Sequence, residues 1–313
     1  MEPSVLVAGE TLVDFLPETA GPLAETERFE RHAGGAPANV AVRLAQLGRP
    51  PWFWTRVGAD PFGEFLAATL SDHGISGRFV ERDPDAATTL AFVGDTDDPD
   101  FSFYRDGTAD TRLEPGHVPD DALAAVEWVA VGGVCLSSEP SRTAVHDLVE
   151  RAADHDCTVC FDPNARPELW PDADFAAEVR ELLGAVDVLT ATPGDLRRAG
   201  FDADDPEALA AAVAAAGPDT VFLTLGADGA LGHASEGSPW GPVTARHAGY
   251  EVDTVDTTGA GDAFTAGVLD AFAAGETDAR AVLARANAVA AAATTRAGGT
   301  APLPDIDTVT NRD

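Results

Sequence analysis

Short apolar runs alternate with longer amphipathic segments along most of this 313-residue chain. The runs have the length of buried strands, and the segments between them repeat their apolar positions at helical spacing. Such alternation predicts a mostly parallel sheet with helices on both faces. In the second half we predict strands at Val126–Val134, Thr158–Asp162, Val186–Ala191 and Thr220–Leu225, and helices at Ser141–His155, Asp174–Leu183, Gly194–Ala199 and Pro206–Ala216.

The first third of the chain mixes buried strands with a hairpin. Ser4–Glu10 and Trp52–Gly58 are short apolar runs that end in or near Gly, as expected for strands of the same sheet. Thr88–Gly94 and Phe101–Arg105 flank a turn rich in Asp, Gly and Pro, which predicts a hairpin. Between the first two of these runs, residues 34–48 begin with two glycines and a proline and predict a helix closed by its final Gly.

The C-terminal part begins with the acidic, Thr-rich segment of Asp253–Gly267, which passes through two glycines into an apolar helix. That helix is expected to end near Gly275, and a second Ala-rich helix follows at Asp278–Thr295. Residues 17–31 and 303–313 show little regular pattern. Because the chain contains no repeat, low-complexity block or long linker, we expect one domain spanning residues 1–313.

The net charge of −33 is extreme, with 53 acidic residues against 20 basic ones, all of them Arg. This surface would repel nucleic acid and anionic membranes, so we expect neither as a partner. Molar salt shortens the screening length to about 3 Å, which would remove most self-repulsion, and we therefore expect a halophile. The first strand begins almost at the N-terminus, without a basic leader, and no apolar run approaches the ~20 residues of a membrane span. A cytoplasmic protein is expected.

Cys157 and Cys160 have the spacing of a zinc knuckle, but they lie in an apolar segment that predicts a strand. Residues three apart on a strand point to opposite faces, so these two thiols would not share a metal. There is no second Cys pair. We expect ordinary buried cysteines.

Asp262 is the most informative acidic residue, because it follows Gly259, Ala260 and Gly261 at the start of a predicted helix. Small residues there let backbone N–H groups face an anion, and the helix dipole adds positive potential. The carboxylate has two possible roles. It can cap the helix, worth about 1 kcal/mol, or it can act as a base beside an anion-binding backbone.

The string D-T-T-G-A-G-D-A-F at 256–264 resembles the C-terminal signature of ribokinase-type (PfkB) sugar kinases, and G-G-A-P-A-N-V-A at 34–41 resembles their N-terminal sugar-binding signature. The resemblance covers nearly the whole chain. It implies an α/β fold, a ribokinase-like three-layer sandwich with a mostly parallel central sheet. It also implies a small β-sheet lid built from approximately residues 11–33 and 88–112. In this family the last Asp is the catalytic base and the Gly-Ala-Gly backbone forms the anion hole, so these roles fall to Asp262 and to Gly259, Ala260 and Gly261.

The resemblance also implies which residues bind the sugar. The candidates lie in the two glycine-flanked segments near the N-terminus, on the lid strand and in the D-P-N-x-R segment: Asp14, Gly34, Gly35, Asn39, Tyr104, Arg105, Asn164 and Arg166. Several have ordinary structural alternatives from the residues alone. Asp14 can be a turn carboxylate, Asn39 a helix-start residue, Arg105 a surface charge and Arg166 a structural ion pair.

The ATP side is expected in the T-x-G-x-x-G segment, with Thr224, Gly226 and Gly229 at the nucleotide and Asn287 at the adenine, unless Asn287 is only a helix-surface residue. A P-loop is excluded because the chain has no Lys, and the glycine spacing does not match a dinucleotide fold.

Two cation sites are implied by the resemblance. Thr192 and Asp195 stand where most of the family has Asn-x-x-Glu, and Asp195 is the candidate for Mg²⁺ through water. Asp256, Thr258 and Gly299 are candidates for a monovalent cation such as K⁺.

The resemblance therefore implies an ATP-dependent carbohydrate kinase. The strand F-S-F-Y-R-D and the D-P-N-x-R segment are similar to those of fructokinases, so fructose is the expected sugar. 2-Keto-3-deoxygluconate is the second candidate, since its carboxylate would suit Arg105 and Arg166. A candidate from another class is a sugar- or nucleotide-binding regulator without catalysis. Lid strands often pair between subunits in this family, which makes a homodimer the expected assembly.

Overall fold

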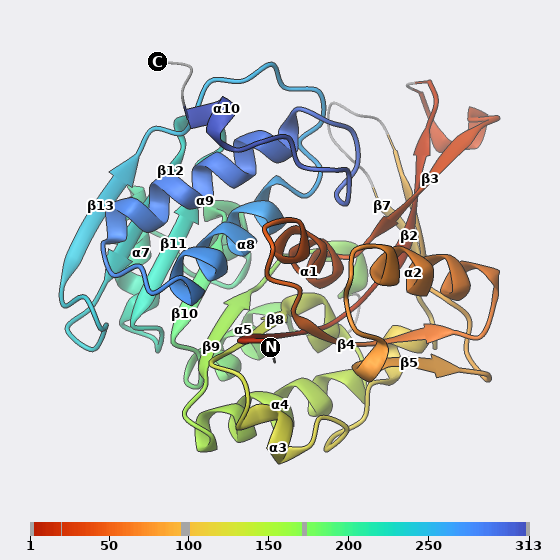
Figure 1. Cartoon of the computed structure of the whole chain (residues 1–313), viewed down its shortest axis with the longest axis horizontal. Coiled ribbons are helices and arrows are strands. Elements are labelled where there is room, and N and C mark those ends of the chain that lie inside the picture. The colour runs from red at the N-terminus through yellow and green to blue at the C-terminus, as the bar shows by residue number, and fades with distance from the viewer. Residues whose placement is uncertain (1–2, 20, 95–100, 171–173, 311–313) are drawn as a thin grey trace.

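A computed structural model describes residues 3–19, 21–94, 101–170 and 174–310. Within these residues, nine strands form one sheet in the order β13-β12-β11-β10-β9-β8-β1-β4-β5 (Figure 1). All neighbours from β11 to β5 pair in parallel, and β12 and β13 are antiparallel. The strands are β1 (Val5–Ala8), β4 (Trp52–Gly58), β5 (Val80–Asp83), β8 (Trp128–Gly132), β9 (Thr158–Asp162), β10 (Val188–Ala191), β11 (Thr220–Thr224), β12 (Ala230–Ala234) and β13 (Val243–His247). The predicted mostly parallel sheet is confirmed.

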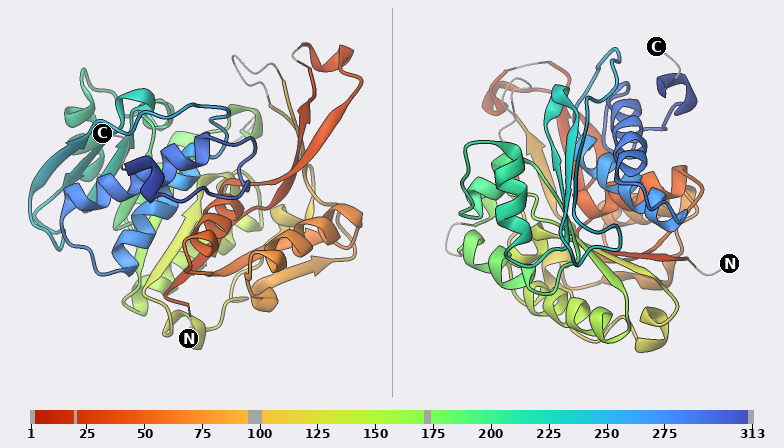
Figure 2. Two further views of the ribbon diagram at one scale, coloured as in Figure 1. Left: turned by 45° about the horizontal axis from the view of Figure 1, so that its top comes forward. Right: turned by 90° about the vertical axis from the view of Figure 1, so that its left-hand side faces the viewer.

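Helices cover both faces of this sheet, as the right-hand view of Figure 2 shows. Alternate residues of β1 belong to different hydrophobic clusters. Leu6 and Ala8 belong to the first cluster, and Val5 and Val7 belong to the second. The first cluster contains side chains of α4 (Ser141–Asp154), α5 (Phe175–Leu183), α6 (Pro193–Arg198) and α7 (Pro206–Ala214), and the second those of α1 (Ala36–Gln46), α8 (Ala260–Ala273) and α9 (Ala279–Thr294). This is a three-layer sandwich whose strands are buried on both sides.

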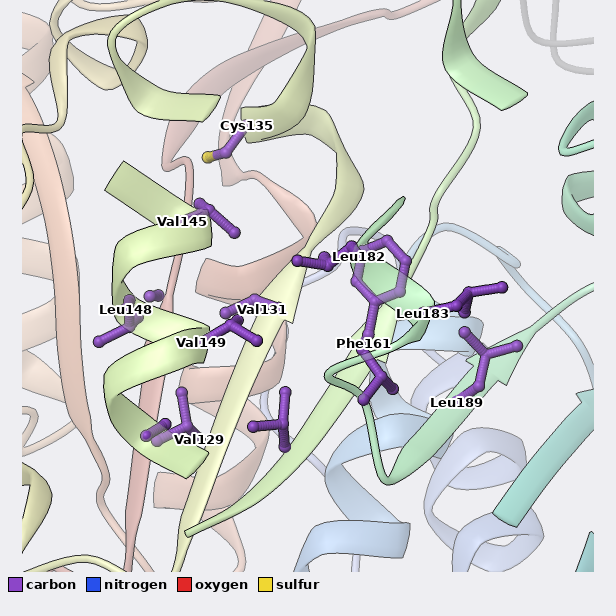
Figure 3. Close-up of a cluster of buried hydrophobic side chains, with 14 of the residues drawn as sticks. Val129, Val131, Cys135, Val145, Leu148, Val149, Phe161, Leu182, Leu183 and Leu189 are labelled. Atoms are coloured by element: carbon purple, nitrogen blue, oxygen red, sulfur yellow. The ribbon is translucent and has the colours of Figure 1, made fainter. Parts of the chain in front are cut away.

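Figure 3 shows part of the first cluster, where Val145 and Val149 of α4 lie beside Val131 of β8. Cys157 belongs to this cluster, whereas Cys160 belongs to the cluster on the opposite face. The two thiols are buried and separated by the sheet, as the strand periodicity predicts.

A second sheet has the order β3-β2-β6-β7 and stands out from one side of the molecule (Figures 1 and 2). Its strands are β2 (Leu12–Pro17), β3 (Phe29–Gly34), β6 (Leu90–Val93) and β7 (Phe101–Tyr104), which lie in the two segments expected to form a lid. Phe15 stacks on Phe92 at 4.8 Å between ring centroids, and Phe29 meets both rings edge-on. The predicted turn at 95–100 lies outside the described residues.

Several predicted element boundaries are wrong, because contacts with distant parts of the chain decide where those elements begin or end. The strand predicted to reach residue 134 ends at Gly132, because Gly133 packs against the Pro163 carbonyl, where a Cβ would come within 2.1 Å. Part of the segment predicted to lack pattern forms β3, since it pairs with β2. The C-terminal tail includes a short helix, α10 (Asp307–Thr310), whose Val309 is buried.

The remaining described helices are α2 (Pro61–Asp72) and the single-turn α3 (Asp120–Leu123). Asp60 caps α2 by accepting hydrogen bonds from the amides of Phe62 and Gly63. Within the described residues, none of the helices is both long enough and apolar enough to cross a bilayer.

Candidate active site

The Asp262 carboxylate lies in the first turn of α8, where the glycine stretch enters the helix. Gly259 is the N-cap residue, with a left-handed backbone (φ 74°, ψ 11°), and no side chain caps it. The capping role left open for Asp262 is therefore not the one the structure shows. Its buried side chain turns to α1 instead, where Oδ2 accepts a 2.7 Å hydrogen bond from Nδ2 of Asn39.

The backbone around Asp262 leaves an amide donor for an anion. The Ala260 N–H donates to the Thr257 carbonyl at 3.1 Å, so it is already engaged. Among the described residues, the Gly261 N–H has no hydrogen-bond acceptor. A Cβ added to Gly261 would meet nothing within 4 Å, so the space in front of this residue is open. An anion at this helix start would also interact with the helix dipole.

Asn39 connects this helix start to the N-terminal signature. It is buried in the first turn of α1, and its Oδ1 has no hydrogen-bond partner in the described structure. Gly299 packs directly against it, since a Cβ there would lie 2.6 Å from Nδ2. A buried acceptor without a donor is costly. A ligand hydroxyl would supply the missing donor.

Asp14 is on a strand of the second sheet, so it is not the turn carboxylate that the residues alone left open. It lies in β2, opposite His32 of β3. A Cβ on Gly34 would approach Asp14 Oδ2 to 1.9 Å, so a larger residue would push that carboxylate aside. The neighbouring Gly35 has φ 97° and packs on the Glu10 carbonyl, where a Cβ would come within 2.6 Å. Gly35 is thus required by backbone contact, and Gly34 leaves room for the Asp14 side chain.

Electrostatic coupling joins Asp14, Arg166 and Asp262 in one site. Burial raises the pKa of Asp14 to about 7; the positive charge of Arg166 opposes this shift and the charge of Asp262 adds to it. Burial also raises the pKa of Asp262, while the Asn39 hydrogen bond and the charges of Arg166 and Arg43 lower it. Arg166 therefore lies at the predicted site, and its Nη1 also donates to the Ala165 carbonyl at 3.0 Å.

The last residue of β9, Asp162, brings a further carboxylate to the same place. Asn164 has a positive φ of 38° and donates its backbone N–H to Asp162 Oδ1 at 3.0 Å. Burial raises the pKa of Asp162 to about 8, and the negative charges of Asp195 and Asp262 raise it further. The Asp162 carboxylate is therefore repelled by both of the others, which a bound cation would relieve.

A groove lined in part by the Gly-Ala-Gly backbone has a volume of about 1150 Å³. Its lining includes the four residues predicted for the nucleotide and two of the anion-hole residues: Thr224, Gly226, Gly229, Asn287, Ala260 and Gly261. Asn287 is buried, which rules out the helix-surface alternative, and its Nδ2 donates to the Leu283 carbonyl at 2.8 Å. The residues predicted for the nucleotide and two of those predicted for the anion hole thus line one groove.

Comparison with known proteins agrees with this geometry. The model of a family described as pfkB family carbohydrate kinase matches residues 2–306. The chain belongs to this family. It is therefore a kinase, a phosphotransferase acting on carbohydrates.

Relatives within the family include fructokinases. The chain is 33% identical over 315 residues to probable fructokinase-5 of Arabidopsis thaliana, covering 96% of this chain and 94% of the relative. A fructokinase from Xylella fastidiosa with bound ATP has a TM-score of 0.86 and 28% identity, over 98% of this chain and 97% of that chain. A fructokinase double mutant from Vibrio cholerae with fructose, ADP and potassium bound has a TM-score of 0.83 and 28% identity, over 99% and 98% of the two chains. These neighbours confirm the ribokinase-like fold.

Arg105 of the kinase is not the surface charge that the sequence left open. Its side chain is buried: Nε donates to Asp110 Oδ2 at 2.7 Å and Nη1 donates to Ser137 Oγ at 2.7 Å. Its Nη2 has no partner among the described residues. Tyr104, the preceding residue, is 64% exposed. Arg105 therefore has one donor left for a ligand, with most of its charge balanced by Asp110.

Sequence reasoning missed Glu10 and Asp110. Glu10 accepts the Ala36 N–H at 3.2 Å, next to Gly35, and burial raises its pKa to about 7 while the charge of Arg105 opposes the shift. Its place directly after β1, at the edge where open sheets bind ligands, was a usable signal. Asp110 had no comparable signal, because only the tertiary fold turns it toward Arg105.

The candidate cation ligands of the kinase already make structural contacts. Asp195 Oδ2 accepts from the amide and hydroxyl of Thr192 in a capping box, and its Oδ1 accepts from the Ala165 amide at 3.0 Å. Asp256 accepts from the amides of Thr258 and Gly298, at 2.9 and 2.8 Å, and these bonds lower its pKa although burial opposes them. The hydrogen bonds of Asp256 with Thr258 and Gly298 bring together the two segments predicted to bind the monovalent cation. No cluster of three or more His, Cys, Asp or Glu suited to a metal occurs in the described part of the chain.

Proposed function

We propose that this kinase transfers the γ-phosphoryl group of ATP to a hydroxyl of fructose. The observation that carries the proposal is the 2.7 Å hydrogen bond between Asn39 and Asp262. It joins the predicted sugar-binding signature to a buried carboxylate that directly follows Ala260 and Gly261, two residues of the groove lining. Fructokinases among the relatives support the choice of sugar.

The proposed reaction uses Asp262 as the general base. Asp14, Gly34, Gly35, Asn39 and Arg105 orient the sugar, with Tyr104, Asn164 and Arg166 at its edge. Asp262 takes the proton of one hydroxyl, and that oxygen attacks the γ-phosphorus in line with the leaving ADP. The Gly261 amide and the N-terminus of α8 stabilise the charge on the transferred group. Thr224, Gly226 and Gly229 contact the phosphates or ribose, and Asn287 lies at the adenine.

The chain's own residues fit two cations in this proposal. The negative charges of Asp162, Asp195 and Asp262 favour a nearby Mg²⁺ ion, which Asp195 would hold through water, since the described residues include no cluster that would bind a metal directly. When bound with ATP, Mg²⁺ neutralises charge on the phosphates. The segments joined by Asp256 and Gly298 would hold K⁺ through oxygen ligands, with Thr258 and Gly299 beside them.

We also propose that residues 11–33 and 88–112 act as a lid over the sugar, within a single domain of residues 1–313. Asp14 lies on this sheet and Arg105 directly follows its strand β7, so closure would complete the sugar site and exclude water. The exposed Tyr104 ring meets Phe92 at 5.6 Å on the same sheet. This aromatic surface supports a homodimer formed through the lids, without nucleic acid or membrane as a partner.

Fructose is preferred over 2-keto-3-deoxygluconate because of the Arg105–Asp110 pair. A substrate carboxylate would compete with Asp110 for a guanidinium that is already charge-balanced. A neutral ketose needs only Nη2 of Arg105, the donor that has no partner among the described residues. The non-catalytic regulator is disfavoured, since burying an ionisable base beside an open anion site has a cost that binding alone would not require.

Substrate identity is checked by measuring ADP release with a panel of ketoses and keto-acids. We expect turnover with fructose, because the site offers hydroxyl acceptors and little net positive charge. Preferred turnover of 2-keto-3-deoxygluconate would establish the second candidate. Binding of both sugar and ATP without ADP release would instead favour the regulator.

The charge of −33 supports a further proposal, that the kinase works in the high-salt cytoplasm of a halophile. We expect the unfolding temperature to rise steeply with KCl, because screening removes the repulsion among the acidic side chains. Circular dichroism melting curves in increasing KCl measure this. Equal unfolding temperatures in dilute buffer and in molar KCl would contradict it.

A further inference from the structure

Asp110 is a buried carboxylate that the reaction proposed above does not use. Its side chain is 1% exposed, and Oδ2 accepts the 2.7 Å hydrogen bond from Nε of Arg105. Oδ1 accepts from the hydroxyls of Thr89 and Thr108, the latter at 2.9 Å. Both carboxylate oxygens are therefore occupied, and Asp110 cannot turn away from Arg105 without losing charge-assisted bonds.

The fold itself sets the position of Asp110. Its main-chain carbonyl accepts a 2.8 Å hydrogen bond from Oγ of Ser141, the first residue of α4. Thr89 directly precedes β6 and Thr108 lies just after β7, so the carboxylate is held at the base of the second sheet. Protein contacts alone thus fix the carboxylate beside Arg105.

The guanidinium of Arg105 is fixed by this pair and by one neutral partner. Nη1 donates to Ser137 Oγ at 2.7 Å, and that hydroxyl donates onward to the Val134 carbonyl at 2.7 Å. Among the described residues, Asp110 is the only carboxylate within ion-pair distance of Arg105. Nη2 is buried and has no partner among these residues. The remaining donor therefore belongs to a group whose positive charge Asp110 already balances.

We propose that Asp110 determines which class of sugar this kinase accepts. Because Asp110 cancels the charge of Arg105, Nη2 acts as a donor without net charge toward a hydroxyl or keto oxygen of a neutral ketose. A sugar acid that brought its carboxylate to Nη2 would gain no net positive charge and would be repelled by Asp110. The inference rests on the proposed place of Arg105 at the sugar, and it goes further by assigning the exclusion of sugar acids to one residue. Asp110 acts through Arg105, so it is a specificity-determining residue and not a catalytic one.

The test is the ratio of the kcat/KM values for fructose and 2-keto-3-deoxygluconate in Asp110→Asn. The amide keeps the size of the side chain and an oxygen for Nε of Arg105, but it leaves the guanidinium charge unbalanced. We expect the ratio to shift toward the keto-acid by at least about tenfold, because a carboxylate then meets an unpaired positive charge. Both values come from one enzyme sample, so a loss of folded protein lowers them equally and leaves the ratio unchanged. A merely structural role for Asp110 predicts that unchanged ratio.

Control variants separate the effect of charge from that of packing. Ser137→Ala removes the neutral partner of the same guanidinium, so we expect both kcat/KM values to fall and their ratio to stay native. Asp83→Asn removes a carboxylate that pairs at 3.1 Å with Arg112, which lies on the same 3-10 helix as Asp110. Asp83 has no ion pair with Arg105 among the described residues, so this variant should keep both activities within a few-fold of native. Asp110→Glu, which restores the charge, should retain the preference for the ketose.

If Asp110→Asn does not fold, Arg105→Gln tests the same charge pair from the other side. It leaves Asp110 unbalanced, so the ratio should shift further toward fructose. A native ratio in the folded variant, or an equal shift in Ser137→Ala, would overturn the inference and leave the fructokinase proposal intact. A native enzyme that prefers 2-keto-3-deoxygluconate would overturn both the inference and the choice of fructose. A native protein that turns over neither sugar would overturn the proposed function, and the inference with it.

Discussion

Asp262→Asn is expected to lower kcat by at least about 1000-fold while leaving sugar binding nearly intact. The amide has the shape of the carboxylate and can still accept the Asn39 hydrogen bond, but it cannot take the proton of a hydroxyl. Stability should be unchanged or higher, because burial raises the pKa of Asp262 and so disfavours its charged form. ADP release, calorimetric titration with fructose and thermal melting measure the three quantities.

Asp270→Asn is the matched control on the same helix. Asp270 is also buried, and it pairs with Arg49 and Arg285 at 2.7 Å each, away from the groove. Its loss should reduce the unfolding temperature and leave kcat within a few-fold of native, since it has no part in proton transfer. Native turnover by Asp262→Asn would show that the proposed mechanism is wrong.

Gly261→Ala should fold at least as well as the native chain and still lose about 100-fold in kcat. Ala is the better helix former by up to about 1 kcal/mol, and the added Cβ meets no atom within 4 Å. In the proposed mechanism the transferred phosphoryl group approaches the Gly261 amide through that open space, and loss of one such donor typically costs about 10²–10³-fold. Melting curves and steady-state kinetics measure the two effects separately.

Gly77→Ala provides the comparison for this prediction. Gly77 also has open space around its position, but it lies in a short 3-10 turn (Gly77–Phe79) beside β5, at the opposite edge of the sheet from the groove. Its substitution should leave kcat unchanged. Full activity in Gly261→Ala would mean that the phosphoryl group does not pass in front of this amide.

The sheet was predictable from local pattern because each parallel strand is a nearly uninterrupted apolar run. Thr158–Asp162 was predicted to the residue, and the strands on either side of it were missed by two residues or fewer at each end. The second sheet was harder to predict, because β3 contains Glu30 and Arg31 and is defined as a strand only by its pairing with β2. Exposed strands on a small sheet carry a weaker apolar signal.

What the sequence alone determined is the chemistry of the helix start: glycines that expose an amide, followed at once by a carboxylate. These features are contiguous, so the local chain specifies them. Only the tertiary structure placed Asn39 against Asp262, 223 positions away, and turned Arg105 inward to Asp110. It also buried Arg43, with its Nε and Nη2 unpaired among the described residues. Such contacts depend on how separate elements pack against one another. Neither the spacing of residues along the chain nor its composition predicts which distant side chains will meet.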